Sequence, residues 1–250
     1  MKQLLLIGIG PGDPQQITLQ AVDALRRAQV FFLLNKGSPT HELVDARRQL
    51  LQQHVPDGDY RVVEVTDAVR DGQGGDYVGA VQAWHLQRAM LYQRLLEEHL
   101  QPGELGAFLL WGDPGLYDST VRILERVREL GTQVAIEIIP GISSVQALAA
   151  RHAIALNRIG EPLTVLPGRQ LARHDRIDNV VVMLDGQCTF TQIDAEGLFI
   201  YWGAYIGTPD EQLIAGPLSE VKDRIVQVRE EARARKGWIM DTYLLRRMPC

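Results

Sequence analysis

Three short apolar runs in this chain each lead directly into a turn rich in glycine or proline, and these turns constrain the fold most. The runs are Leu4–Ile9, Phe108–Trp111 and Val134–Ile139, and the turns are Gly8–Pro14, Trp111–Tyr117 and Pro140–Ser144. Short apolar runs bounded by turn signals are typical of buried strands. In open α/β sheets, ligands bind at the carboxyl ends of such strands. The three turns are therefore candidate site segments.

The first half of the chain alternates strand and helix patterns. Thr18 is a predicted N-cap, and further strands are expected at Val30–Leu34 and Arg61–Val65. Helical periodicity covers residues 40–53, 80–100 and 120–130. The segment Asp71–Gly79 holds four glycines and predicts a mobile loop, whose action as a lid is left open. This alternation predicts a parallel sheet with helices on both faces.

The pattern changes around residues 155–160. Strands are expected at Leu163–Leu166, Val180–Leu184, Leu198–Trp202 and Trp238–Leu245, with one long helix at Leu218–Arg235. We therefore expect two α/β domains: residues 1–156 with a parallel sheet, and residues 160–250, smaller, with a mixed sheet. A cleft between two such domains is a common place for a small-molecule site.

Composition narrows the function classes. The formal net charge of −5 argues against a broad nucleic-acid surface, which requires a basic face. No apolar run approaches the length of a bilayer span, and no signal peptide is recognisable at the N-terminus. Cys188 and Cys250 form no framework of bridges or metal ligands, and the six histidines show no ligand spacing. We expect a cytoplasmic protein with no metal.

The first turn invites a dinucleotide-binding interpretation, which its details disfavour. Asp13 occupies the place of the third fingerprint glycine, and Pro11 and Pro14 lack the amides that a pyrophosphate would use. The second strand ends at Asn35-Lys36, without a carboxylate for a ribose. A tight turn that allows another backbone to come close, or a turn that lines a substrate site, fits better.

Together, the three turns resemble those of the tetrapyrrole methylase family. The order is GIGPGDP-x-x-x-T-L-x-A, then WGDPGLYDS, then PGISS, each after a strand. The resemblance covers nearly the whole chain. Further segments are similar to the corrin branch of the family: Val30–Gly37, Trp84-His85, Tyr201–Thr208 and Asp241–Arg247.

The resemblance implies the fold of this family, with the active site in the cleft between the two domains, and a methyltransferase that uses S-adenosyl-L-methionine and releases S-adenosyl-L-homocysteine. The implied reaction of cobalamin biosynthesis removes an acetyl group from ring carbon 1 of precorrin-5 and methylates that carbon. It also implies a small-molecule tetrapyrrole substrate, no nucleic-acid or membrane partner, and a homodimer. Carried over by position, the cofactor contacts are Pro11, Gly112, Asp113, Leu116, Ser144, Val145, Leu184, Gly203, Ala204 and Thr242.

Deacetylation also requires a general base, and motif position places four candidates near the site. Asp185 and Tyr117 are the preferred catalytic residues, while Asp113 and Asp118 are alternatives. Asp118 is better explained as a cap of the helix that begins near Ser119. The segment Met183–Gly186 departs from the Met-Gly of many relatives, which puts the cofactor contact there in doubt.

The substrate's carboxylates require local positive charge on an acidic protein. The candidates are Lys36, Arg88, Arg169, Arg173 and Arg176.

Three other functions compete with this reaction. The first is another precorrin methyltransferase that acts on a different ring carbon. The second is diphthine synthase, which belongs to the same family and modifies a protein side chain. The third, outside this class of enzymes, is a nucleotide-binding regulatory domain built on the first turn.

Overall fold

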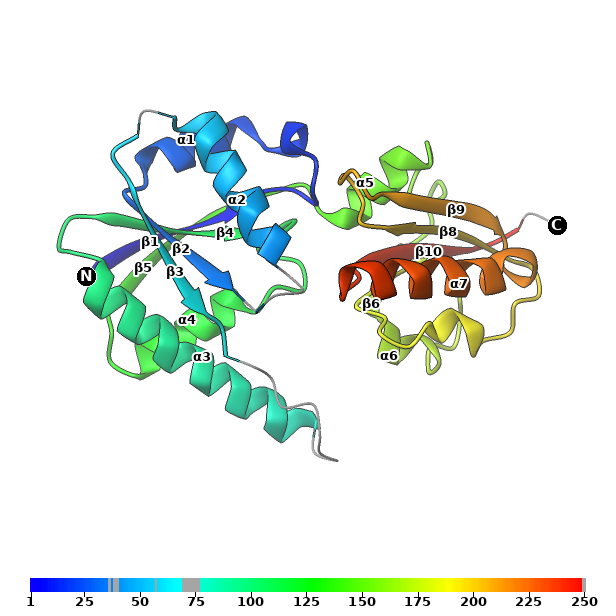
Figure 1. Cartoon of the computed structure of the whole chain (residues 1–250). Coiled ribbons are helices and arrows are strands. Elements are labelled where there is room, and N and C mark those ends of the chain that lie inside the picture. The colour runs from blue at the N-terminus through cyan, green and yellow to red at the C-terminus, as the bar shows by residue number, and fades with distance from the viewer. Residues whose placement is uncertain (36, 38–40, 57, 69–76, 249–250) are drawn as a thin grey trace. The chain divides into compact units, whose positions relative to one another are not determined.

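The computed structural model describes residues 1–35, 37, 41–56, 58–68 and 77–248, and the chain divides into two compact units (Figure 1). The first unit contains Met1–Gly10 and Pro14–Ile142, and the second contains Pro11–Asp13 and Ser143–Cys250. Lys36, Cys250 and residues 71–76 of the predicted loop lie outside the described residues. The end of that predicted loop is helical, because α3 begins at Tyr77.

The first unit is built on a parallel sheet of five strands in the order β3-β2-β4-β1-β5. The strands are β1 (Lys2–Gly8), β2 (Val30–Asn35), β3 (Arg61–Thr66), β4 (Leu105–Leu110) and β5 (Val134–Ile139). The connecting segments contain a short turn of 3-10 helix, η1 (Pro14–Gln16), and the helices α1 (Leu19–Arg27), α2 (His41–His54), α3 (Tyr77–His99) and α4 (Thr120–Glu129). The predicted parallel sheet is confirmed.

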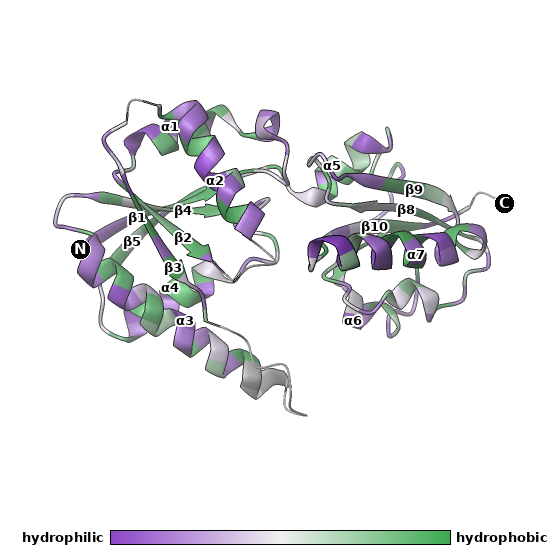
Figure 2. Cartoon of the chain, viewed as in Figure 1, coloured by the Kyte–Doolittle hydropathy of each residue, from purple (hydrophilic) through white to green (hydrophobic). Residues whose placement is uncertain are grey.

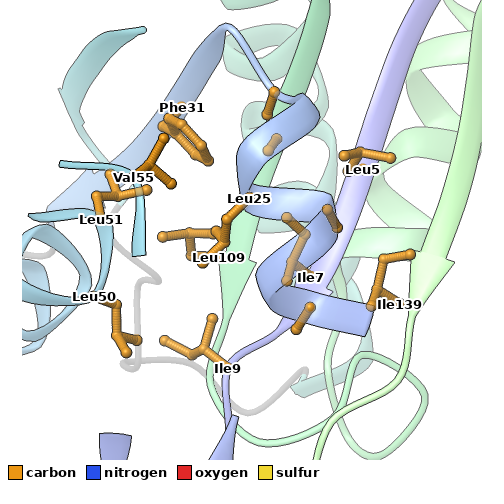
Figure 3. Packing of buried hydrophobic residues seen from close by; sticks show 14 of the residues in the cluster. Leu5, Ile7, Ile9, Leu25, Phe31, Leu50, Leu51, Val55, Leu109 and Ile139 are labelled. Atoms are coloured by element: carbon orange, nitrogen blue, oxygen red, sulfur yellow. The ribbon is translucent and has the colours of Figure 1, made fainter. Parts of the chain in front are cut away.

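Alternating side chains of the strands fill two cores, one on each face of this sheet. Leu5 and Ile7 of β1 pack with α1 and α2, as the labelled side chains of Figure 3 show. Leu4 and Leu6 of the same strand pack with α3 and α4. Successive residues of a strand point to opposite faces, so an uninterrupted apolar run is what a strand covered on both faces requires.

The second unit contains a mixed sheet in the order β6-β7-β10-β8-β9. The strands are β6 (Thr164–Pro167), β7 (Val180–Met183), β8 (Leu198–Ala204), β9 (Gln212–Pro217) and β10 (Asp241–Arg247). Only β6 and β7 are parallel, while β10 runs antiparallel to both β7 and β8. The predicted mixed sheet is confirmed, although β9 was not expected from the sequence.

Among the described residues of the second unit, three helices and one short 3-10 turn accompany this second sheet. The elements are α5 (Ser144–Arg151), α6 (Gly168–Leu171), η3 (Thr189–Thr191, a 3-10 turn) and α7 (Leu218–Lys236). The apolar side of α7 contributes Leu218, Ile225 and Ala232 to a core around Trp202, and the outer side of α7 is hydrophilic (Figure 2). Helix α5 packs on β8 and β10.

The packing of α5 explains where the units divide. The sequence predicts a domain boundary between residues 156 and 160, whereas the compact units divide between Ile142 and Ser143. Because α5 packs on the second sheet, it falls in the second unit although its sequence follows the third glycine-rich turn. As functional domains, 1–156 and 160–250 stay a prediction.

Thr18 caps α1 as the sequence predicts, since its Oγ1 accepts a hydrogen bond of 3.0 Å from the Ala21 amide. We expect Thr18→Ala to lower the free energy of unfolding by about 1 kcal/mol. Thr18→Ser keeps the acceptor and should change it little. Urea denaturation of both variants checks this, and equal stabilities would contradict it.

Candidate functional site

Three backbone segments meet at the carboxyl ends of β1, β4 and β5. A Cβ added to Gly141 would lie 2.2 Å from the carbonyl oxygen of Gly112, and one added to Gly8 would lie 2.6 Å from the Gly141 amide nitrogen. Real Cβ atoms essentially never come so near, so each of these two positions requires glycine. Gly8 and Gly141 were not singled out as site residues from the sequence, although both lie in the predicted turns.

The first turn is fixed to the second by backbone hydrogen bonds. Gly10 and Gly112 form an isolated antiparallel bridge, with N–O distances of 3.3 and 2.8 Å. Both residues have positive φ, 82° and 71°, which glycine adopts without strain. This confirms that the first turn is a tight turn that allows another backbone to come close. Pro11 is buried and belongs with Gly12 and Asp13 to the second unit.

Asp113 ties the second turn to the third. Its Oδ1 accepts a hydrogen bond of 2.8 Å from the Gly115 amide, and its Oδ2 accepts one of 2.9 Å from the Gly141 amide. Both oxygens of the carboxylate are therefore engaged by the backbone. This geometry favours a structural role for Asp113 over the role of general base.

The rest of the second turn contains a half-buried leucine and an exposed tyrosine, and an aspartate follows it. The Leu116 amide donates to the Asp113 carbonyl oxygen at 3.2 Å, and the Leu116 side chain is half-buried. Tyr117 is 42% exposed and has a φ of 53°, a left-handed conformation that is strained for a residue other than glycine. Oδ1 of Asp118 accepts from the Thr120 amide at 2.7 Å, which supports the capping interpretation.

The third turn opens α5 with a complete capping box. Ser143 caps the helix, since its Oγ accepts from the Val145 amide at 3.2 Å, while Gln146 accepts from the Ser143 amide. Oγ of Ser144 lies 3.0 Å from Oγ1 of Thr242, so two predicted cofactor contacts that are distant in sequence are hydrogen-bonded. The side chain of Val145 is buried.

Strand pairing brings the remaining predicted contacts to one edge of the second sheet. Thr242 of β10 lies between Met183 of β7 and Gly203 of β8. Leu184 follows Met183, and Ala204 follows Gly203, so both lie at this edge. Leu184 is 64% exposed and has a φ of 54°. An exposed leucine in a strained conformation is an unusual feature that favours a functional role.

Asp185 is held in a closed network of hydrogen bonds. Its side chain accepts from the Gln187 amide, from both the amide and the hydroxyl of Thr189, and from the Tyr243 hydroxyl, at 2.6 to 3.1 Å. The residue is 4% exposed, and a Cβ on Gly168 would overlap it. The carboxylate raises the pKa of Tyr243 further above the value that burial imposes. The geometry favours a structural role here also.

The basic residues predicted to bind the substrate differ in burial and in their partners. Arg88 is buried, and its guanidinium binds Asp67, Ser119 and Tyr92. Arg176 is exposed and pairs with Asp178 at 3.8 Å. Arg169 and Arg173 are exposed on and after α6. Sequence reasoning missed Arg47 of α2, whose guanidinium lies 5.8 Å from the ring centroid of Trp111.

The described part of the chain contains neither a cluster of metal-binding side chains nor a helix able to cross a membrane. Within residues 1–35, 37, 41–56, 58–68 and 77–248, no three His, Cys, Asp or Glu side chains are grouped to hold a metal ion. No helix in that part of the chain is both long and apolar enough to cross a membrane. The expectation of a metal-free site stays a prediction.

The close approach of the Gly8, Gly112 and Gly141 backbones has a measurable effect on stability. We expect Gly141→Ala to lower the free energy of unfolding by about 3 kcal/mol, because the new methyl group forces backbone segments apart. Gly186→Ala is the matched control, since a Cβ there meets open space and its φ is not left-handed. Urea denaturation compares the two, and a Gly141 variant as stable as the control would contradict the packing.

Replacing Asp185 tests its structural role. Asp185→Asn puts an amide donor among four donors, and we expect a loss of about 2 kcal/mol in the free energy of unfolding. Thermal and urea unfolding measure the loss. A variant as stable as the original that has lost only its activity would show that Asp185 acts catalytically.

Comparisons with known proteins agree with this geometry. The family model described as Tetrapyrrole (Corrin/Porphyrin) Methylases matches residues 3–222. The chain is 47% identical over 250 residues to the precorrin-6A synthase [deacetylating] of Sinorhizobium sp, which covers 99% of this chain and 96% of the relative.

Solved structures show the same fold. A crystal structure of a cobalamin synthesis related protein (CobF) from Corynebacterium diphtheriae superposes with a TM-score of 0.86 at 36% identity, over 100% of both chains. The uroporphyrin-III C-methyltransferase of Thermus thermophilus, complexed with S-adenosylhomocysteine, has a TM-score of 0.62 at 18% identity, over 97% of this chain and 91% of that one. The chain belongs to the tetrapyrrole (corrin/porphyrin) methylase family.

Proposed function

We propose that this protein is an S-adenosylmethionine-dependent C-methyltransferase of cobalamin biosynthesis. It methylates precorrin-5 at ring carbon 1 with hydrolytic loss of acetate, which gives precorrin-6A. The observation that carries this proposal is the 47% identity, over 99% of the chain, to a precorrin-6A synthase of the deacetylating type. The three turns that carry the family resemblance lie at strand ends or helix starts, where α/β proteins bind ligands.

The chemistry of the proposed contacts fits this cofactor. A sulfonium is a cation, and the contacts include the Asp113 carboxylate and the Ser144 and Thr242 hydroxyls but no cationic side chain. We propose that Leu116, Val145 and Leu184 supply apolar side chains for the rest of the cofactor. Gly112, Gly203 and Ala204 have small side chains or none, so their backbone groups can contact the cofactor directly. We propose Pro11 as a further contact.

The reaction has two parts. When bound, the cofactor supplies an electrophilic methyl group. For the other part, water adds to the acetyl carbonyl, the bond between the ring carbon and the carbonyl carbon breaks, and acetate leaves. The electron pair of the broken bond stays on the ring carbon, which is also the carbon that is methylated, and the order of the two parts stays open. The chain's own residues must orient the two reactants, and orientation can supply roughly 7–11 kcal/mol of the barrier.

Among the predicted catalytic residues, geometry separates Tyr117 from Asp185. Every oxygen of Asp185 and Asp113 already accepts hydrogen bonds within the protein. In exposure, Asp185 and Tyr117 differ: Asp185 is 4% exposed, whereas Tyr117 is 42% exposed on the second turn. We infer that the Tyr117 hydroxyl donates to the acetyl carbonyl oxygen and stabilises its developing charge. We propose a homodimer on the ground of the family resemblance, and a cytoplasmic location on the ground of the cysteine content.

Incubation with precorrin-5 and methyl-labelled cofactor tests the proposal. We expect released acetate together with a labelled ring. Tyr117→Phe should lower kcat by about 100-fold while leaving the binding of S-adenosylhomocysteine unchanged, because only the hydroxyl is lost. Mass spectrometry of the ring and an acetate assay measure the two products.

Other products would distinguish the alternatives. A labelled ring without acetate indicates a different precorrin methyltransferase, and transfer only to a protein side chain indicates diphthine synthase. Binding of NAD but not S-adenosylhomocysteine would indicate the nucleotide-binding regulatory domain. A Tyr117→Phe variant with full deacetylating activity would refute the role assigned to that hydroxyl.

A further inference from the structure

Arg47 differs from most of the other arginines of the first unit in the way its charge is compensated. Arg27, Arg48, Arg61 and Arg88 all pair with carboxylates. Arg47 is half-buried on α2, and in the part of the chain that the structure describes no carboxylate forms an ion pair with it. Burial lowers its pKa to about 10, against the opposing effect of the Asp118 charge, so the guanidinium is still charged at neutral pH.

Two backbone carbonyls hold this guanidinium in place. Nε donates to the Leu109 carbonyl oxygen at 2.9 Å, and Nη1 donates to the Leu43 carbonyl oxygen at 2.6 Å. The first bond holds the guanidinium at Leu109, the penultimate residue of β4. The guanidinium carbon lies 5.8 Å from the ring centroid of Trp111. Arg47 is therefore anchored beside the second glycine-rich turn.

The anchored group keeps part of its donor capacity. A guanidinium has five N–H donors in a planar fork. Two of them are used by the carbonyls of Leu43 and Leu109, and Nη2 has no hydrogen-bond partner among the described residues. Such a fork matches the two oxygens of a carboxylate. A fixed cation of this kind, with no ion-pair partner among the described residues, favours the binding of an anion.

We propose that Arg47 binds a carboxylate of a ligand seated at the carboxyl end of β4. This proposal rests on the proposed function, because a corrin precursor carries carboxylate side chains. The amino-acid part of the cofactor also carries a carboxylate, so the experiment separates the two sources. In either case Arg47 is a binding residue that none of the sequence motifs indicates.

Equilibrium titration of four proteins tests the proposal: the original protein, Arg47→Gln, Arg47→Lys and Arg48→Gln. The probes are uroporphyrin III, a stable tetrapyrrole with carboxylate side chains on every ring, and S-adenosylhomocysteine. We expect Arg47→Gln to weaken uroporphyrin binding about 10- to 100-fold. Arg47→Lys should weaken it less, since it keeps the charge but loses the fork. Arg48→Gln is the matched control on the same helix, because Arg48 pairs with Glu64 at the surface.

The outcomes are separable. Weakened binding of S-adenosylhomocysteine instead of uroporphyrin would assign the carboxylate to the cofactor and still support the proposal. Unchanged affinity of Arg47→Gln for both probes, or an original protein that binds neither, would overturn it. Thermal unfolding shows whether each variant is folded, and Arg47→Lys serves if Arg47→Gln is not. Failure of the proposed function would appear separately, as absence of acetate release from precorrin-5.

Discussion

The close approach of three strand ends at Gly8, Gly112 and Gly141 is the constraint on which the first unit depends. No side chain fits between the Gly141 and Gly112 backbones, where a Cβ would lie 2.2 Å from an oxygen. The Asp113 carboxylate then locks the same junction by accepting from two amides. The two features act together, because a carboxylate can bridge the turns only if the backbones are already this close. The backbone of the second turn is thus held in place by contacts within the protein itself.

The second unit uses a buried carboxylate in the same way. Asp185 accepts four hydrogen bonds from residues on η3, on β10 and on the loop between β7 and η3, and its own carbonyl oxygen accepts from Arg229. A buried carboxylate with every lone pair engaged is well suited to fixing a loop. Asp113 and Asp185 therefore both organise the backbone around them.

Local sequence signals predicted most of the fold. The strand of Val134–Ile139 and the N-cap at Thr18 were predicted as observed, because continuous apolar runs and capping residues act over short distances. The strand Gln212–Pro217 was missed, since Gln212, Gly216 and Pro217 leave only a short apolar run between them. The helix Ser144–Arg151 packs on the second sheet, and this packing depends on contacts that are distant in sequence.

The site was less predictable than the fold. Motif position indicated Asp113 and Asp185, but not that their oxygens are already engaged, because that depends on where the Gly141 amide and the Tyr243 hydroxyl lie in space. For the same reason nothing in the sequence distinguishes Arg47 from its neighbour Arg48. Only the fold shows that one pairs with an acid and the other does not.

The left-handed backbone of Leu184 has a consequence for protein engineering. A leucine in this conformation costs the chain roughly 1–2 kcal/mol relative to an unstrained residue, and glycine would relieve that cost. Its side chain is mostly exposed, so little packing energy is recovered. A selection for heat resistance alone would therefore favour glycine at this position and remove an apolar group from the edge where Thr242, Gly203 and Ala204 meet. Thermostabilised versions of this enzyme should keep the leucine fixed during the search.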